Sequence, residues 1–263
     1  SLAVGTVVSN TTATLQGDAG GAPGGATVNA GTGSVQVEAV NATSSTVDAG
    51  AEMTGSGASA RLGVGASVGV NVGVNTTLAE VGNGAVLTGG SDMALNAQAE
   101  HEMSTTVEGG AGGASIAVTP VAAVSVGINS TTARLGTGTA LNLSGGYSSE
   151  ATQTTSQTTE ATGATEGSQI AVGASLGLGV AEDTVVASVE RNLTATGDID
   201  VKAASTSKSD TSATASVAGG KEADANGEAA AGESVDEQVT GQGDAAKDSG
   251  KATATKAGKA SAE

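Results

Sequence analysis

The residues of this chain that could do chemistry are few and scattered. Its 263 residues include a single histidine, His101, and no cysteine, which excludes disulfides, cysteine-based zinc sites and cysteine nucleophiles. A catalytic histidine needs a partner placed beside it, but His101 lies in the alternating stretch Ala99-Glu100-His101-Glu102-Met103, where no such spacing is recognisable. We therefore predict that His101 is a solvated strand residue and that the chain is not an enzyme.

Four aspartates, Asp18, Asp92, Asp198 and Asp200, lie close to glycines, as calcium ligands on turns often do. The dense Gly-Gly-x-Gly-x-Asp repeat of calcium β-rolls is absent. Solvated turn residues are the simpler interpretation, so we expect no cofactor. Calcium bound by these four aspartates stays open as the alternative.

The arginines Arg61, Arg134 and Arg191 are isolated in the sequence and do not occupy equivalent repeat positions. A β-helix enzyme that cleaves polysaccharides needs acids, bases and cations clustered in one groove. We expect these three arginines to form surface ion pairs instead.

Composition and charge exclude further classes. The chain has 42 glycines, no Trp or Phe and one Tyr, with 27 acidic against ten basic residues and a net charge of −17. Nucleic-acid binding needs a basic face and aromatic platforms, and an anionic membrane repels such a chain. No apolar run is long enough, or free enough of glycine and polar residues, to span a bilayer as a helix.

Internal repetition is the strongest signal in the sequence. The segments Val64–Thr77, Val118–Thr131 and Val172–Val185 resemble one another at offsets of about 54 residues, and Leu2–Val8 begins a fourth copy at an offset of about 66 residues. Apolar residues alternate with Gly, Ser, Asn or Ala in every copy, which predicts half-buried strands. The expected inward residues are Val64, Ala66, Val68, Val70, Val72, Val74; Val118, Pro120, Ala122, Val124, Val126, Ile128; and Val172, Ala174, Leu176, Leu178, Val180.

Each copy continues past this alternating strand. We expect a polar turn at Ser9, Asn75, Asn129 and Asp183, because Asn and Asp suit turns. A short strand, a Gly-punctuated segment and a polar arm then follow. The arm ends in Gly-rich loops at 109–113 and 163–167.

These parts predict an all-β fold, a parallel β-solenoid of about four repeats of about 54 residues. The repeats span 1–58, 59–113, 114–167 and 168–220. A single copy buries too little apolar surface to fold alone, so the neighbouring repeats must stack on one another. Residues 221–263 are charged and small, which favours an acidic loop or tail.

The order of parts resembles the repeat regions of giant bacterial surface adhesins, such as filamentous-haemagglutinin-like proteins and autotransporter passengers. The resemblance covers residues 1–220 and rests on the Gly63–Val74 strand, the Asn75-Thr76-Thr77 segment and the Gly82–Gly90 segment. It implies an exported rod whose function resides in other domains or in its summed surface.

We therefore expect a shaft or spacer of an extracellular or bacterial cell-surface adhesin, matrix fibre or biofilm filament. Its expected partners are neighbouring repeats or further copies, together with host or matrix glycans, and not nucleic acid. The alternative is a carbohydrate-binding or carbohydrate-cleaving β-helix. A groove lined by acids would favour that alternative, whereas a featureless Thr, Ser and Gly surface would disfavour it.

Overall fold

The computed structural model describes residues 1–16, 26–51 and 61–219, and its fold is all-β. Period-two alternation and abundant Val and Thr favour strands over helices throughout these segments. The strands are β1 (Leu2–Leu15), β2 (Thr27–Gly31), β3 (Val35–Ala51), β4 (Leu62–Val64), β5 (Ser67–Val81), β6 (Val86–Gly89), β7 (Met93–Leu135), β8 (Leu141–Leu143), β9 (Tyr147–Val189), β10 (Leu193–Ala195) and β11 (Ile199–Gly219).

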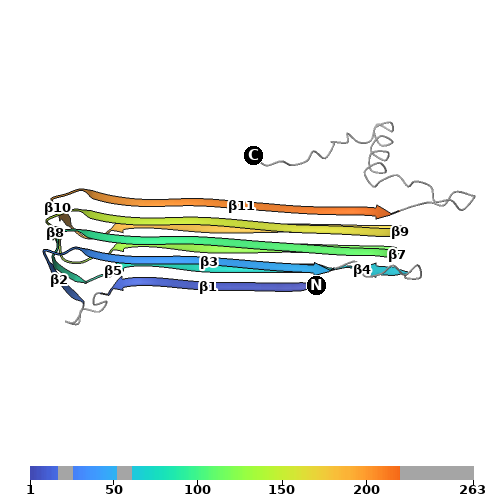
Figure 1. Cartoon of the computed structure of the whole chain (residues 1–263), viewed down its shortest axis with the longest axis horizontal. Coiled ribbons are helices and arrows are strands. Elements are labelled where there is room, and N and C mark those ends of the chain that lie inside the picture. Colours follow the sequence, from blue (N-terminus) through green and yellow to red (C-terminus); the bar gives the residue numbers. More distant parts are fainter. Residues whose placement is uncertain (17–25, 52–60, 220–263) are drawn as a thin grey trace, which may run out of the picture.

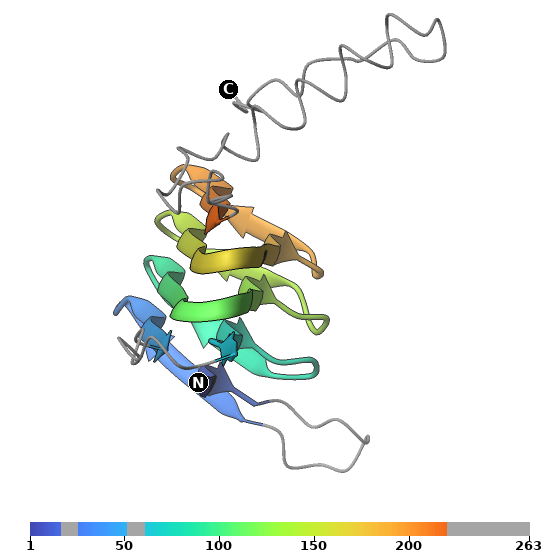
Figure 2. The same cartoon turned by 90° about the vertical axis from the view of Figure 1, so that its right-hand side faces the viewer.

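The strands form a stack of four coils, and each coil is a flat loop of two long arms joined by a short strand (Figures 1 and 2). β7 and β9 each supply one arm to one coil and one arm to the next. One layer of the stack, the A layer, holds β1, β4, β5, and the second halves of β7 and β9. The B layer holds β3, the first halves of β7 and β9, and β11. The short strands β2, β6, β8 and β10 close one end (Figure 1).

Neighbouring coils pair in parallel and in register over nearly their whole length. Asn75 pairs with Asn129, and Asn129 with Asp183, so one coil corresponds to one 54-residue repeat. The prediction of a parallel β-solenoid is confirmed. The expected Gly-rich loops at 109–113 and 163–167 lie at the end of the arms where β7 and β9 pass from the B layer to the A layer. Strand pairing continues up to this reversal, and the register between β7 and β9 shifts only between Ala111 and Ile116.

The interior is divided along the length of the arms. Its main apolar core lies at the end closed by the short strands, around Tyr147, Leu95, Leu135 and Leu141, all at most 2 % exposed. A smaller apolar cluster around Val107 lies toward the opposite end. Buried polar side chains such as Ser125, Asn129 and Thr131 fill the space between the two clusters.

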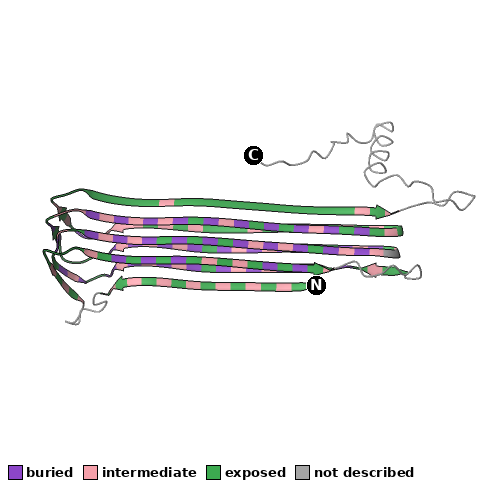
Figure 3. Cartoon of the chain, in the orientation of Figure 1, coloured by how far each residue is buried: buried purple, intermediate pink, exposed green. Residues whose placement is uncertain are grey.

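The expected direction of the alternating strand in the A layer is wrong. Val68, Val74 and Ile128 are at least 36 % exposed, whereas Ser67, Asn71 and Ser125 between them are fully buried. Figure 3 shows buried residues alternating with partly or fully exposed ones along the two middle coils. The residues expected to point inward therefore point outward.

Close approach of the two layers explains the inversion. A Cβ atom added to Gly69 would overlap Cγ2 of Val107 in the B layer, and one added to Gly73 would lie 3.1 Å from Sδ of Met103. Large residues of the B layer occupy the space opposite these glycines. Glycine therefore fills the inward positions opposite Val107 and Met103, and the valines that flank Gly69 and Gly73 point outward.

The expected polar turn is also wrong. Asn75 lies within β5, Asn129 within β7 and Asp183 within β9, and the strands continue for six residues beyond each of them. The side chains of Asn75 and Asn129 are buried, at 3 % and 5 % exposure. They point into the interior because they have the same parity as the inward glycines and serines. Residues 221–263, expected as an acidic loop or tail, lie outside the described residues.

Candidate functional site: two faces and a polar interior

The outer face of the A layer is apolar from Leu62 to Val74 and over the equivalent stretches of the neighbouring coils. Its outward side chains stack in columns across the coils, because the in-register pairing places equivalent residues side by side. The columns are Leu62, Ile116, Ile170; Val64, Val118, Val172; Ala66, Pro120, Ala174; Leu2, Val68, Ala122, Leu176; Val4, Val70, Val124, Leu178; Thr6, Val72, Val126, Val180; and Val8, Val74, Ile128, Glu182.

Thr6 and Glu182 are the polar members of this apolar face. Leu2, Leu62 and Leu176 are exposed by 72 %, 62 % and 59 %. Contiguous apolar surface of this extent is rare on a soluble chain and normally marks an interaction site. Large aliphatic residues in fixed columns can bind another apolar surface, but they have no groups for acid–base or nucleophilic chemistry.

The outer face of the B layer is polar and acidic. Threonine, serine and glutamine are the commonest outward residues. The outward carboxylates are Glu38, Asp48, Glu100, Glu102, Glu108, Glu150, Glu160, Glu166, Asp200 and Asp210. Two lysines offset this charge locally. Lys202 pairs with Glu150 at 2.6 Å, and Lys208 pairs with Asp210 at 2.7 Å. The solenoid therefore has one apolar face and one acidic face.

A ladder of amides and a carboxylate runs through the interior across three coils. Nδ2 of Asn75 donates to Oδ1 of Asn129 at 2.8 Å, and Nδ2 of Asn129 donates to Oδ1 of Asp183 at 2.8 Å. The carboxylate of Asp183 also accepts from Nε2 of Gln153 at 2.9 Å and from the hydroxyl of Thr155 at 2.8 Å. Each amide satisfies the next, so the polar interior locks one coil to its neighbour.

Asp183 stays ionised within this ladder. Burial by itself would raise its pKa, but hydrogen bonds from Ser207, Asn129 and Thr155 outweigh that effect, and the pKa lies below its usual value. A carboxylate that accepts several hydrogen bonds is stabilised in its charged form. It therefore acts as an acceptor that terminates the ladder.

His101 is buried, at 3 % exposure, so the expectation of a solvated histidine is wrong. Its Nδ1 lies 2.7 Å from the hydroxyl of Thr43, and its Nε2 is buried with no hydrogen-bond partner among the described residues. Burial lowers the pKa of His101, and the nearby charge of Asp183 opposes this only in part. The imidazole is therefore neutral near pH 7. His101 is buried because it occupies one of the alternate positions of β7 that point inward, whereas Glu100 and Glu102 on either side point outward.

The three arginines have different environments. Arg134 forms the expected ion pairs on the outside, with Glu80 at 2.9 Å and with Glu190 at 3.3 Å, and these carboxylates raise its pKa. Arg61 is exposed.

The expectation of a surface ion pair is wrong for Arg191, which is 8 % exposed. Its guanidinium donates to the carbonyl oxygens of Gly136 (2.5 Å), Ala85 (2.9 Å), Thr137 (3.2 Å) and Gly82 (3.4 Å). These carbonyls belong to the turns before the short strands of two neighbouring coils. Arg191 thus ties three coils together where the backbone leaves the long strands.

Three of the candidate calcium ligands, Asp92, Asp198 and Asp200, line one shallow groove beside Tyr147 on the outside of the stack. Asp92 is already engaged, because its Oδ1 accepts the backbone N–H of Gly146 at 2.8 Å, a bond that lowers its pKa. Within 1–16, 26–51 and 61–219, no three Asp, Glu or His side chains converge closely enough to hold a metal ion. Asp18 lies outside the described residues, and calcium bound by these aspartates stays the untested alternative.

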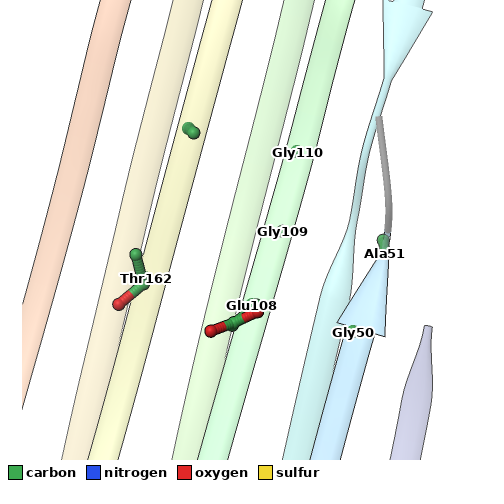
Figure 4. A pocket seen from close by; sticks show the side chains of 7 residues that line it. Gly50, Ala51, Glu108, Gly109, Gly110 and Thr162 are labelled. Atoms are coloured by element: carbon green, nitrogen blue, oxygen red, sulfur yellow. The ribbon is translucent and has the colours of Figure 1, made fainter. Parts of the chain in front are cut away.

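A second depression lies on the B layer, across β3, β7 and β9 near the end of the arms opposite the short strands (Figure 4). Its lining consists of backbone and small side chains from three coils, with Glu108 as its single ionisable group. One carboxylate without a partner base or cation supplies no recognisable reaction centre.

Searches of protein families, of curated proteins and of solved structures find no match to this chain. The described residues contain no helix that is long and apolar enough to cross a membrane. The functional interpretation therefore rests on the chain's own geometry.

Sequence reasoning missed two functional features, and both had a signal. In β5 the glycines and the buried asparagines occupy the same alternate positions. Placing these glycines inside puts the valines between them on the outer face, which predicts the apolar face. Arg191 stands 54 residues after Thr137 and 108 after Asn83, in a turn that repeats in each copy. A long cation in that turn is well placed to reach the carbonyls of the coils beside it.

Proposed function

We propose that this chain is a structural shaft or spacer segment of a secreted or cell-surface adhesin, or of an extracellular matrix fibre. Its role is mechanical and multivalent rather than catalytic. The observation that carries the proposal is the parallel register that joins all four coils over nearly the whole length of both layers.

In-register stacking supports a shaft because each coil is the template for the next. Strands β1 and β11 each pair on one side only within the described part of the chain, so both ends of the stack present strand edges that can accept a further coil. The interior bonds also run along the stacking direction, through the amide ladder and through Arg191. A rod that must carry load between its ends needs bonds in this direction.

The acidic face suits an exported fibre. A high net negative charge keeps a long repetitive chain soluble and limits nonspecific contact with anionic surfaces. Its outward Thr and Ser residues resemble the featureless surface that disfavours the carbohydrate-cleaving alternative.

Force spectroscopy on the whole chain, held at its two ends, tests the proposal. One coil of about 54 residues releases roughly 190 Å of extended chain at about 3.5 Å per residue. A shaft predicts resistance in steps of roughly 190 Å or multiples of it. Extension without resolved resistance would contradict a load-bearing role, and so would hydrolysis of a glycan by the purified chain.

A further inference from the structure

We infer that the apolar face of the A layer is a pairing surface for a second copy of the same chain, which packs against it face to face. This inference goes beyond the shaft proposal and does not depend on it. It names the surface, the partner and the symmetry of the contact, and its test is separate.

Every outward residue of the A layer between Leu62 and Val74, between Ile116 and Ile128, and between Ile170 and Val180 is apolar, in a chain of net charge −17. These side chains contact no other described part of the chain on their outer side, as their exposure shows. Burying them against a surface of the same kind removes the cost of their hydration.

The columns of outward side chains form ridges that run along the stack, about 6.8 Å apart along the strands, with about 4.8 Å between coils. A second copy rotated by 180° presents the same ridges, which fit into the grooves between the first set, as side chains do in zippered sheets. A two-fold contact of this kind is self-complementary, and two-fold dimers are the commonest oligomers.

The apolar face is large enough for a stable interface. Its 25 outward positions, spaced about 6.8 Å along the strands and about 4.8 Å between coils, cover roughly 820 Å² on each copy. Two copies then bury about 1,600 Å², the size of a standard stable interface. The apolar patch alone is therefore large enough to hold a dimer together.

Two acidic B faces would repel each other, so the A faces are the ones through which two copies meet. A lipid bilayer is a poorer occupant, because Arg134 on the outside of the A layer is already paired with Glu80 and Glu190, which leaves Arg61 beside the apolar face for phosphate groups. The chain also has no Trp to anchor at the interface.

Analytical ultracentrifugation of the full chain tests the pairing. The native chain should sediment as a dimer at micromolar concentration. The variant Val124→Glu/Leu178→Glu places two carboxylates in the column next to the central one, and should raise the dissociation constant at least 100-fold. The matched control Thr154→Glu/Thr158→Glu adds the same charge to exposed positions on the acidic face, and should remain a dimer.

A second measurement keeps the test decisive if the first variant does not fold. The native chain has no cysteine, so a single Val124→Cys variant can be oxidised in solution. Face-to-face pairing predicts rapid formation of a disulfide-linked dimer, whereas Thr158→Cys should cross-link far more slowly. A native chain that is monomeric at 100 µM (about 100-fold above ordinary working concentration) would overturn the inference, as would equal cross-linking at both positions. A monomer that instead binds phosphatidylcholine vesicles would overturn it in favour of a lipid surface.

Discussion

Replacing Asn129 by alanine should destabilise the solenoid by about 3–5 kcal/mol, because it cuts the interior ladder at its centre. The substitution leaves Nδ2 of Asn75 buried without its acceptor at 2.8 Å, at a cost of about 1–3 kcal/mol. It also removes the 2.8 Å donor from the ionised Asp183, where a hydrogen bond to a charged group contributes about 1.5–3 kcal/mol. Asp183 keeps its bonds from Gln153 and Thr155, which limits the second loss.

Thermal unfolding followed by circular dichroism measures this effect. For a chain of this size, the midpoint of the Asn129→Ala variant should fall by roughly 10 °C. Asn142, which is exposed on β8, offers the matched control, and Asn142→Ala should change stability by no more than about 0.5 kcal/mol. If the two variants melt together, the ladder does not hold the coils and the reasoning is refuted.

Three further predictions concern the remaining interior. Arg191→Met should destabilise the chain by at least about 3 kcal/mol in urea unfolding, because four turn carbonyls lose their donor. The control Arg61→Met should change stability very little, and equal effects of the two substitutions would contradict the buried role of Arg191. Gly69→Ala should lower the free energy of unfolding by about 1–3 kcal/mol, because the two layers are too close there for a methyl group. The control Gly50→Ala should be tolerated, since a Cβ at Gly50 meets nothing within 4 Å. A Gly69→Ala variant as stable as the native chain would show that this position does not face the interior. Because burial lowers the pKa of His101 in the folded chain, the unfolded chain binds the proton more tightly, so stability should be complete above about pH 6.5 and fall as pH drops below it. Between pH 7 and pH 5, the melting temperature of His101→Gln should fall less with decreasing pH than that of the native chain. An equal fall in both proteins would show that His101 does not cause the pH dependence.

The period of the solenoid could be predicted from the sequence because equivalent residues of successive repeats pair with one another in the structure. Segments that begin at Val64, Val118 and Val172 match one another because they lie side by side in the folded chain. Stacking of identical positions leaves a periodic trace in the sequence, and one coil per 54 residues follows from it.

The side of the sheet that faces inward could not be predicted from alternation alone. Period two defines two sets of side chains but does not say which set is inside, and the usual rule places the apolar set there. The distance between the two layers decides the matter here. That distance depends on Val107 and Met103, which lie in the opposite layer and about 35 residues away along the chain from Gly69 and Gly73. The burial of His101 and Arg191 likewise depends on neighbours in other coils, which no local pattern records.

Disulfide trapping of the register tests the central claim, one in-register coil per repeat, most directly. Ser104 pairs with Thr158 across two neighbouring coils, and both point outward on the acidic face, so Ser104→Cys/Thr158→Cys brings two thiols within bonding range. Moving the second cysteine four residues along the strand, in Ser104→Cys/Thr162→Cys, separates them by about 13 Å. The account predicts rapid intramolecular cross-linking of the first pair and none of the second. Failure of the first pair to cross-link, or equal cross-linking of both pairs, would contradict the stacking of one coil per repeat.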